Sequence, residues 1–325
     1  MAGLTPKSED IIVSTSKDGI VRKTIRGWFS GHPRKRFVIP LFQRRYLWGH
    51  KQCKRLFEDA LKSGVDLGMV MVYFNSKNEL IIVDGQQRAT TIMLLLASLR
   101  KRGADVGDVL LYKGTPTLQP TYHDKEPFSA VIENKKPAGA SHVIQTSMWF
   151  DSWTSTLTKY DIDKMTDNLL DRFTILEFTV PQEDDAENLQ VVYERLAIRS
   201  VGIARLMFIA APGVSNGVMD LTRNLVLSYF DETKAIDIYH SHWMPLEVLV
   251  AENDAVYSQE AENRFILHLK KYLESKNCEK FSNSIHGGME VYNSFKKYLK
   301  NERCSENSDK VTFVIQELLN FETVK

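Results

Sequence analysis

The sequence predicts an α+β protein in which a small mixed sheet near the N-terminus is followed by a mostly helical half. Two runs rich in Val, Ile, Met and aromatic residues, 68–75 and 80–83, flank a short polar turn, which is the pattern of a β-hairpin. A leucine-rich helical segment at 90–101 follows the hairpin directly. From Ser147 onward apolar residues recur at helical spacing, apart from a strand-like FTILEFTV at 173–180.

The segments before the hairpin predict short alternating elements. Residues 24–29 fit a short helix, and RFVIPLFQ at 36–43 fits a strand in which Pro40 marks a sheet edge or a strand end. Residues 51–64 carry an apolar stripe at helical spacing and finish on Gly64, which suits the end of a helix.

Composition along the chain suggests three parts. We predict a basic extension over 1–35, a compact module over 36–145 and a mainly helical half over 146–325. Gly, Pro and Lys are frequent in 103–142, which favours a surface excursion of the module. Four segments of the helical half have the spacing of packed helices: 186–199, 218–230, 260–275 and 289–300.

The bulk composition is that of a soluble globular protein. The 325 residues are 43% hydrophobic and 26% charged, with a formal net charge of +1. Three scattered cysteines predict neither a disulfide framework nor a zinc site, and favour a reducing compartment. The N-terminus has no signal-peptide pattern, and no apolar run is long enough to span a membrane. We therefore expect a cytoplasmic protein without a membrane partner.

Charge is distributed unevenly near the N-terminus. From Arg22 to Arg55 the chain has eleven Lys or Arg residues and no Asp or Glu. Such a block is either a solvated basic face or a surface for a phosphate-rich partner, nucleotide or duplex DNA.

Polar residues stand where the second strand of the hairpin meets the helix, in the sequence DGQQR at 84–88. A helix N-terminus presents unpaired N–H groups and the positive end of the helix dipole, so it suits a phosphate. Gly85 permits a sharp turn, and Arg88 can contact phosphate oxygens in pairs. Asp84 suits a Mg²⁺ ion, a water molecule or Arg88 itself. The alternative is a capped helix start in which Asp84 pairs with Arg88 for stability alone.

The other polar side chains of this junction suit the same ligand. Gln86 and Gln87 can orient a water molecule or read a base edge. Thr90 and Thr91 can cap the helix or contact phosphate.

A second polar cluster, IPLFQRRYLW at 39–48, precedes the hairpin. Arginines interleaved with aromatic residues suit stacking on a base and contact with phosphate, whereas the alternative is a buried aromatic corner with exposed arginines. Two clusters that each pair Gln with Arg favour one shared pocket. Its members here are Gln43, Arg44, Arg45, Phe42, Tyr46 and Trp48.

These segments, in this order, resemble the N-terminal domain of GmrSD-type restriction systems, a ParB/sulfiredoxin-like family marked by DGQQR. The resemblance is specific over 36–102 and implies a ParB/sulfiredoxin-like module. It continues more weakly to VMDLTRNLVLSYFDE, pointing to Asp220 and Asn224, and to the WMPLE sequence at Trp243. The family's usual link is lengthened here by an apolar insertion near 198–210.

The resemblance implies nucleotide binding and hydrolysis, or nucleotide sensing, in a system that acts on modified phage DNA. The expected catalytic residues are Asp84, Gln87, Arg88 and Arg44, with Asp84 as the Mg²⁺ ligand. The expected nucleotide-binding residues are Gln43, Arg44, Tyr46, Trp48, Gly85, Gln86, Arg88, Thr90 and Thr91. The alternatives are a non-catalytic module that binds DNA or a protein partner, and a degenerate relative that holds no ligand.

Nuclease chemistry is not expected from this sequence. In the family it resides in a further C-terminal domain with an HNH-type site, and the sequence ends where that domain would start, so a separate nuclease subunit is an expected partner. His240 and His242 form the one close histidine pair, and without an acidic or Asn partner motif such a pair is more often structural.

Overall fold

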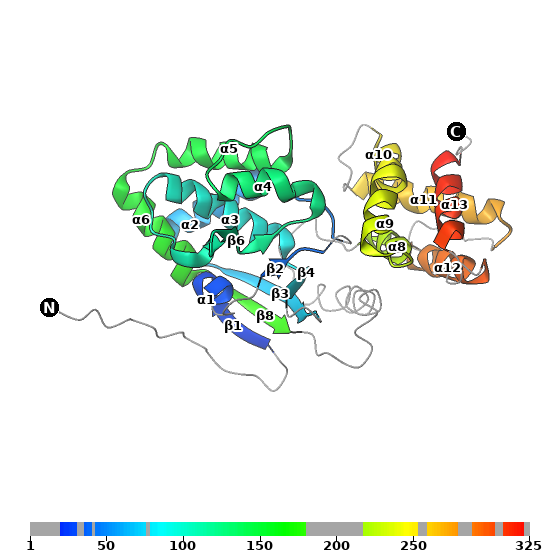
Figure 1. Ribbon diagram of the computed structural model, residues 1–325, viewed down its shortest axis with the longest axis horizontal. Helices are drawn as coiled ribbons and strands as arrows, with labels where there is room; N and C mark the ends of the chain where they lie inside the picture. Colours follow the sequence, from blue (N-terminus) through cyan, green and yellow to red (C-terminus); the bar gives the residue numbers. More distant parts are fainter. Residues whose placement is uncertain are drawn as a thin grey trace. The chain divides into compact units, whose positions relative to one another are not determined.

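A mixed six-stranded sheet organises the first half of the chain in the computed structural model (Figure 1). Its strands, in sheet order, are β1 (Ile20–Thr24), β8 (Thr174–Thr179), β3 (Asp66–Phe74), β4 (Leu80–Asp84), β2 (Phe37–Val38) and β7 (Leu118–Gln119). The pairs β1/β8 and β3/β4 are antiparallel, and the other neighbouring pairs are parallel. The structure describes residues 20–30, 36–40, 43–75, 79–179, 217–252, 259–278, 288–302 and 308–321.

The predicted hairpin is confirmed. Strands β3 and β4 pair in antiparallel register, with Phe74 opposite Leu80. Strand β2 lies between β4 and β7, so it is an interior strand rather than an edge. Pro40 follows the end of β2 at Val38, which is the strand-end alternative, and its missing N–H therefore interrupts no ladder.

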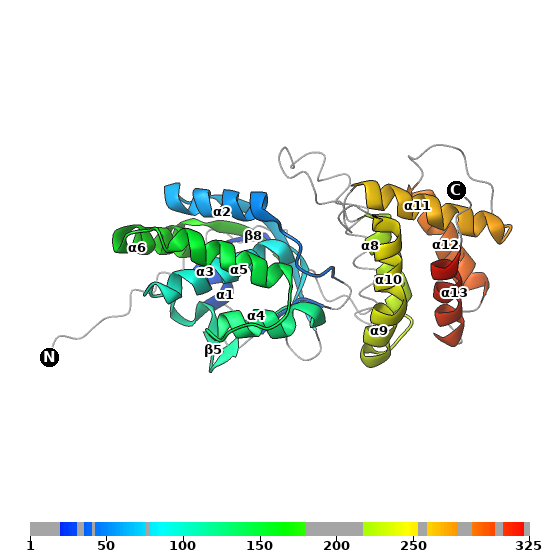
Figure 2. The same cartoon turned by 90° about the horizontal axis from the view of Figure 1, so that it is seen from above.

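Five helices are grouped on one side of this sheet in Figure 1: α2 (His50–Lys62), α3 (Gln86–Lys101), α4 (Lys125–Ile132), α5 (His142–Thr154) and α6 (Lys159–Asp167). Helix α3 is the central one, and every residue from Ala89 to Leu99 is buried. Seen from above, α5 lies over α3 (Figure 2). Cover on all sides explains why the sequence of α3 is apolar around its whole circumference.

Helix α3 begins four residues earlier than the leucine-rich pattern predicts, at Gln86 instead of Thr90. The cause is Gly85, whose left-handed φ of 99° turns the chain directly from β4 into the helix. Gln86, Gln87 and Arg88 are consequently the first turn of the helix and not a loop in front of it. The predicted helices at 24–29 and 51–64 correspond to α1 (Ile25–Ser30) and α2.

The segment 103–142 is not the surface excursion that its composition predicts. It forms η1 (Gly107–Val109), the short pair β5 (Leu111–Tyr112) and β6 (Thr115–Pro116), β7, η2 (Tyr122–Asp124) and α4. The segment buries apolar side chains in the core, and β7 extends the main sheet. Its buried apolar residues include Val109, Leu110, Leu118, Phe128, Val131 and Ile132.

The chain divides into two compact units, residues 1–186 and 187–325. Composition predicts the change to the helical half at 145, but β8 occupies an interior position between β1 and β3. The predicted extension 1–35 likewise contributes β1 and α1, which buries Ile25, Trp28 and Phe29. Segments near both ends of the first unit are therefore part of the sheet and of the core beside it.

The second unit consists of helices over its described residues. These are α8 (Val218–Leu227), α9 (Glu232–Ile238), the π-helical turn η4 (Tyr239–Trp243), α10 (Met244–Ala251), α11 (Gln259–Ser275), α12 (Gly288–Asn301) and α13 (Ser308–Asn320). They confirm an α+β sheet region followed by a mainly helical remainder. The predicted helix at 186–199 and the insertion near 198–210 lie outside the described residues. Over the part of the chain that the structure describes, no helix combines the length and apolar character needed to cross a bilayer.

Candidate functional site

The junction of β4 and α3 places Asp84 as the last residue of the strand and Gly85 as the N-cap of the helix. A Cβ atom on Gly85 would lie 2.6 Å from Cγ1 of Val70, so the position excludes a side chain as well as requiring positive φ. The first turn of α3 contains no acidic residue, so nothing on the helix itself neutralises the positive end of its dipole.

Residues Gln43–Leu47, which we call the QRRYL segment, run against this junction. The Gln43 side chain donates to the carbonyl of Val83 at the end of β4 (2.5 Å). The Gln86 amide donates to the carbonyl of Arg44 (2.8 Å). Gln87 donates to the carbonyl of Arg45 (3.0 Å) and accepts the N–H of Leu47 (2.9 Å). The two polar motifs of the sequence are therefore joined by hydrogen bonds, side chain to backbone.

These bonds change the roles predicted for the two glutamines. Gln86 and Gln87 are only 5% and 7% exposed, and both side-chain amides are engaged with backbone of the QRRYL segment. In this structure they hold the segment in place instead of presenting an amide to a water molecule or a base edge.

Tyr46 is buried, with 2% of its surface exposed, and its hydroxyl lies 2.8 Å from that of Thr91. Burial raises the pKa of the Tyr46 hydroxyl well above its ordinary value. The ring has no open face for a base, so the expected stacking by Tyr46 is not supported. Trp48 is partly exposed at the edge of the core and remains available for stacking, and Phe42 of the same cluster lies outside the described residues.

Thr90 and Thr91 also face the protein interior, where both are buried. The Thr91 hydroxyl donates to the carbonyl of Gln87, one turn earlier (2.7 Å). Neither residue caps the helix or can contact a phosphate outside it, and both belong to the core under the junction.

Arg88 forms hydrogen bonds with the adjacent strand, β3. Its two terminal nitrogens donate to the carbonyls of Leu67 and Met69, the latter at 2.6 Å. These carbonyls flank Gly68, where the register between β3 and β8 shifts. Arg88 also lies 3.5 Å from the Asp84 carboxylate, and both side chains are partly exposed. The Asp84–Arg88 pair anticipated as the structural alternative is thus present.

Asp124 is the residue of this region that sequence reasoning missed. Its carboxylate accepts the N–H of Tyr46 (2.6 Å) and the hydroxyl of Thr121 (3.2 Å), and the residue is 4% exposed. Burial raises the pKa of Asp124, and the two hydrogen bonds and the Arg45 charge oppose that rise. A single Asp in a Gly- and Pro-rich segment gives no sequence signal for this role.

The basic block of 22–55 does not form one free cationic face. Arg22 pairs with Asp66 (2.6 Å), Lys23 with the buried Glu177 (2.6 Å) and Arg26 with Asp171 (2.6 Å). The acidic partners come from sequence positions outside the block, so the local count of charges overstates its net charge in the fold.

The Mg²⁺ ion predicted from the sequence would have Asp84 as its one predicted protein ligand. Among the residues that the structure describes, no group of three or more His, Cys, Asp or Glu side chains is arranged to hold a metal ion. Mg²⁺ is commonly held by one or two carboxylates together with substrate phosphates, and the partly exposed carboxylate of Asp84 fits that donor chemistry.

The second unit buries a polar cluster on α8. Arg223 contacts Asp220 (2.8 Å) and Glu247 (3.1 Å), and the Trp243 N–H donates to Glu247 (2.9 Å). Asp220 and Asn224, the residues of the weaker family match, are both buried. They lie in the interior of this unit.

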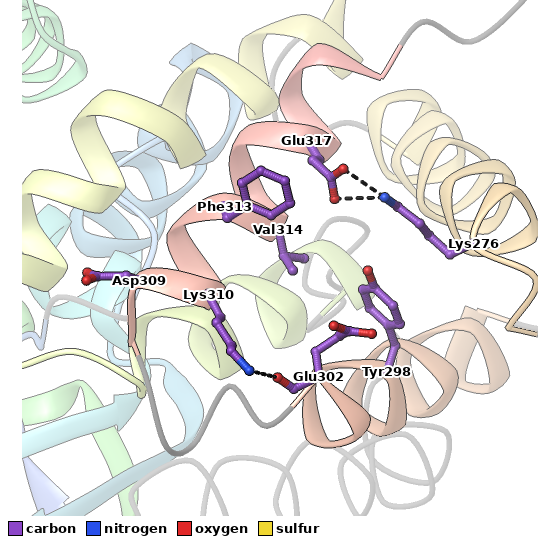
Figure 3. Close-up of a pocket in the computed structure, with 8 residues that line it drawn as sticks. All are labelled: Lys276, Tyr298, Glu302, Asp309, Lys310, Phe313, Val314 and Glu317. Atoms are coloured by element: carbon purple, nitrogen blue, oxygen red, sulfur yellow. Dashed lines mark hydrogen bonds and ion pairs between the residues drawn. The ribbon is translucent and has the colours of Figure 1, made fainter.

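A groove of about 560 Å³ is also present in the second unit, lined by residues of α12 and α13, by Glu302 directly after α12 and by Lys276 (Figure 3). Lys276 is paired with Glu317 at 2.8 Å, and Lys310 donates to the carbonyl of Glu302. The groove contains none of the predicted site residues. The histidines His240 and His242 lie in η4, where His242 contacts the Ser241 hydroxyl (2.6 Å).

Comparison with known proteins gives one family. The family model described as GmrSD restriction endonuclease, N-terminal domain, matches residues 25–205, which begin directly after β1 and include the whole junction and β8. No curated protein matches the chain.

Proposed function

The chain belongs to the family of GmrSD restriction endonuclease N-terminal domains, which makes it a component of a restriction system, and we propose that its first unit binds a nucleoside triphosphate at the start of α3. We propose further that the bound nucleotide is hydrolysed or serves as a signal, and that a separate nuclease subunit responds to it.

The attachment of the QRRYL segment to the start of α3 carries this proposal. Four side chain–backbone hydrogen bonds hold the segment across the end of β4 and the first turn of the helix. They bring the backbone of Arg44 to the N-terminus of a helix whose first turn contains no acidic residue. A phosphate group there would meet N–H groups, the helix dipole and arginine side chains together.

The side chains divide into those that build the site and those that face a ligand. Gln86, Gln87 and Tyr46 fix the backbone. Arg44, partly exposed, is the proposed phosphate ligand and would stabilise charge that develops during transfer. Arg88 adds positive charge near Asp84, and Trp48 offers an aromatic face to the base.

Asp84 is the proposed residue for a Mg²⁺ ion or for the attacking water. When bound, the ion would neutralise phosphate charge and orient the phosphate oxygens. Asp84 lies at the carboxyl end of β4, directly before the helix that would bind the phosphate. Its carboxylate and the phosphate would therefore lie at the same end of this strand.

Isothermal titration with ATP, GTP, CTP and UTP in the presence of Mg²⁺ tests binding. We expect at least one triphosphate to bind wild type, and Arg44→Ala to raise its Kd at least about tenfold, since a charge-assisted contact contributes about 1.5–3 kcal/mol. Lys51→Ala, an exposed cation on α2, is the matched control and leaves Kd within about twofold. Binding of no triphosphate by wild type, or equal effects of both variants, would count against the site.

Release of inorganic phosphate distinguishes a hydrolase from a sensor. In a hydrolase, Asp84→Asn abolishes Mg²⁺-dependent release while Asp108→Asn, an exposed acid elsewhere in the unit, retains it. If the wild-type protein binds nucleotide but releases phosphate only at the background rate, the result supports a nucleotide sensor. Binding of duplex DNA but of no nucleotide would instead support the DNA-binding alternative, with steep salt dependence.

A further inference from the structure

We propose that Asp124 is a positioning residue of the nucleotide site, and that it sets where the QRRYL segment lies on the start of α3. Its effect on nucleotide binding rests on the proposed function, whereas its effect on the segment does not. Asp124 belongs to neither polar motif of the sequence. It lies at the end of η2, in the segment between 103 and 142.

The geometry supports this role because each residue of the QRRYL segment is tied down by a different contact. Gln43, Arg44, Arg45 and Leu47 are all bonded to the end of β4 or to the two glutamines of α3. The backbone of Tyr46 is bonded to Asp124 instead, through a short N–H contact of 2.6 Å. Asp124 is therefore the one backbone anchor of the segment, among the described contacts, that comes from a third element.

The surroundings of Asp124 make this anchor strong. The residue is buried, so its bond to Tyr46 is shielded from water. A carboxylate acceptor forms a stronger bond to an N–H group than a neutral amide does. Thr121 holds the same carboxylate oxygen, and this fixes its orientation.

Arg45 supplies the opposing charge. Its positive charge acts on Asp124 and also on His142, whose pKa is lowered by burial and by this charge. The Nε atom of Arg45 is buried without a hydrogen-bond partner among the described residues. The Arg45 charge thus favours the ionised form of the carboxylate that accepts the Tyr46 N–H.

Limited trypsin digestion of the full chain tests the anchor without any nucleotide. Trypsin cuts after Arg44 and Arg45, so cleavage there reports how often the segment leaves its place. We expect Asp124→Asn, which keeps the shape and an oxygen acceptor but loses the charge, to be cut about five- to twentyfold faster at these two bonds. Asp108→Asn, in the same part of the chain, is expected to be cut at the wild-type rate.

Hydrogen exchange at the Tyr46 amide provides a second readout, which remains usable if cleavage is too slow in both proteins. It is expected to be faster in Asp124→Asn by a similar factor. Unchanged exchange and unchanged cleavage in a folded Asp124→Asn variant would overturn the proposal.

Nucleotide affinity then separates positioning from general stability. Asp124→Asn is expected to raise the Kd of the triphosphates that wild type binds at least about fivefold, whereas Asp171→Asn, which breaks the ion pair with Arg26, leaves Kd unchanged. An equal rise of Kd in both variants would overturn the positioning role. If wild type binds none of the four triphosphates, the proposed function fails, and cleavage and exchange still decide whether Asp124 anchors the segment.

Discussion

Arg88 shows how one side chain of the motif supports the fold as well as the proposed site. It bonds two carbonyls on either side of Gly68 through two separate guanidinium nitrogens, whereas lysine offers a single ammonium nitrogen. We expect Arg88→Lys to lower the free energy of unfolding by about 2–3 kcal/mol in urea denaturation. Arg55→Lys, at a 70% exposed side chain, is expected to change it by less than about 0.5 kcal/mol. Similar losses in the two variants would contradict the structural role of Arg88.

We expect the stability of the second unit to depend on pH because of Glu262. It accepts the N–H of Met219, and burial and the nearby Asp220 raise its pKa from 4.5 to about 7. Between these values the native state keeps a proton that the unfolded chain has released. The free energy of unfolding therefore falls as pH rises through about 4.5–7, by up to about 3 kcal/mol at about 1.4 kcal/mol per pH unit.

Denaturation of Glu262→Gln at two pH values checks this dependence. The variant is expected to be more stable than wild type at about pH 8 and close to wild type at about pH 4.5, because glutamine is neutral throughout. Glu260→Gln, at an exposed position of the same helix, is expected to show no such difference. A stability difference that does not change with pH would contradict the raised pKa.

At the residue scale the sequence could identify the polar residues but not their partners. The pairing of Gln with Arg in both clusters predicted their proximity, and the hydrogen bonds join them. Whether a glutamine amide faces solvent or backbone depends on how two segments that are distant in sequence lie against each other. The local sequence pattern carries no information about that arrangement. Asp124 escapes sequence reasoning for the same reason, since its partner Tyr46 lies far away along the chain.

The start of α3 is an element whose geometry depends on a single glycine. Gly85→Ala adds strain at φ 99° and an overlap with Val70, so we expect a loss of about 2–4 kcal/mol in the free energy of unfolding. Gly103 follows the same helix with φ 83°, and a Cβ added there would meet no atom within 4 Å. Gly103→Ala is therefore the control for backbone strain alone, and we expect it to lower the free energy of unfolding by about 1 kcal/mol. Equal losses at both positions would contradict the close approach at Gly85.

Long periodic elements were predictable, and short ones were not. The hairpin and helices α2, α8, α11 and α12 follow patterns of several apolar residues at regular spacing. The two-residue strands β5, β6 and β7 carry no such period, so composition alone predicts a surface segment at 103–142 although its apolar residues are buried. Tertiary packing, rather than local propensity, decides the structure of such segments.

At the scale of the whole molecule, the family match at 25–205 and the first unit at 1–186 overlap over residues 25–186. The proposed nucleotide site lies entirely within this unit. The buried cluster around Arg223 belongs to the second unit and is accounted for by internal contacts of that unit. We therefore place the proposed nucleotide chemistry in the first unit.

Hydrogen–deuterium exchange of the full chain with and without Mg²⁺ and each of the four nucleoside triphosphates tests the central claim most directly. A bound nucleotide is expected to protect peptides that cover 43–48 and 84–88, and to leave peptides of α12 and α13, which line the groove of the second unit, unchanged. Protection of α12 and α13 with no change at the start of α3, or no protection by any triphosphate, would contradict the assignment of the site.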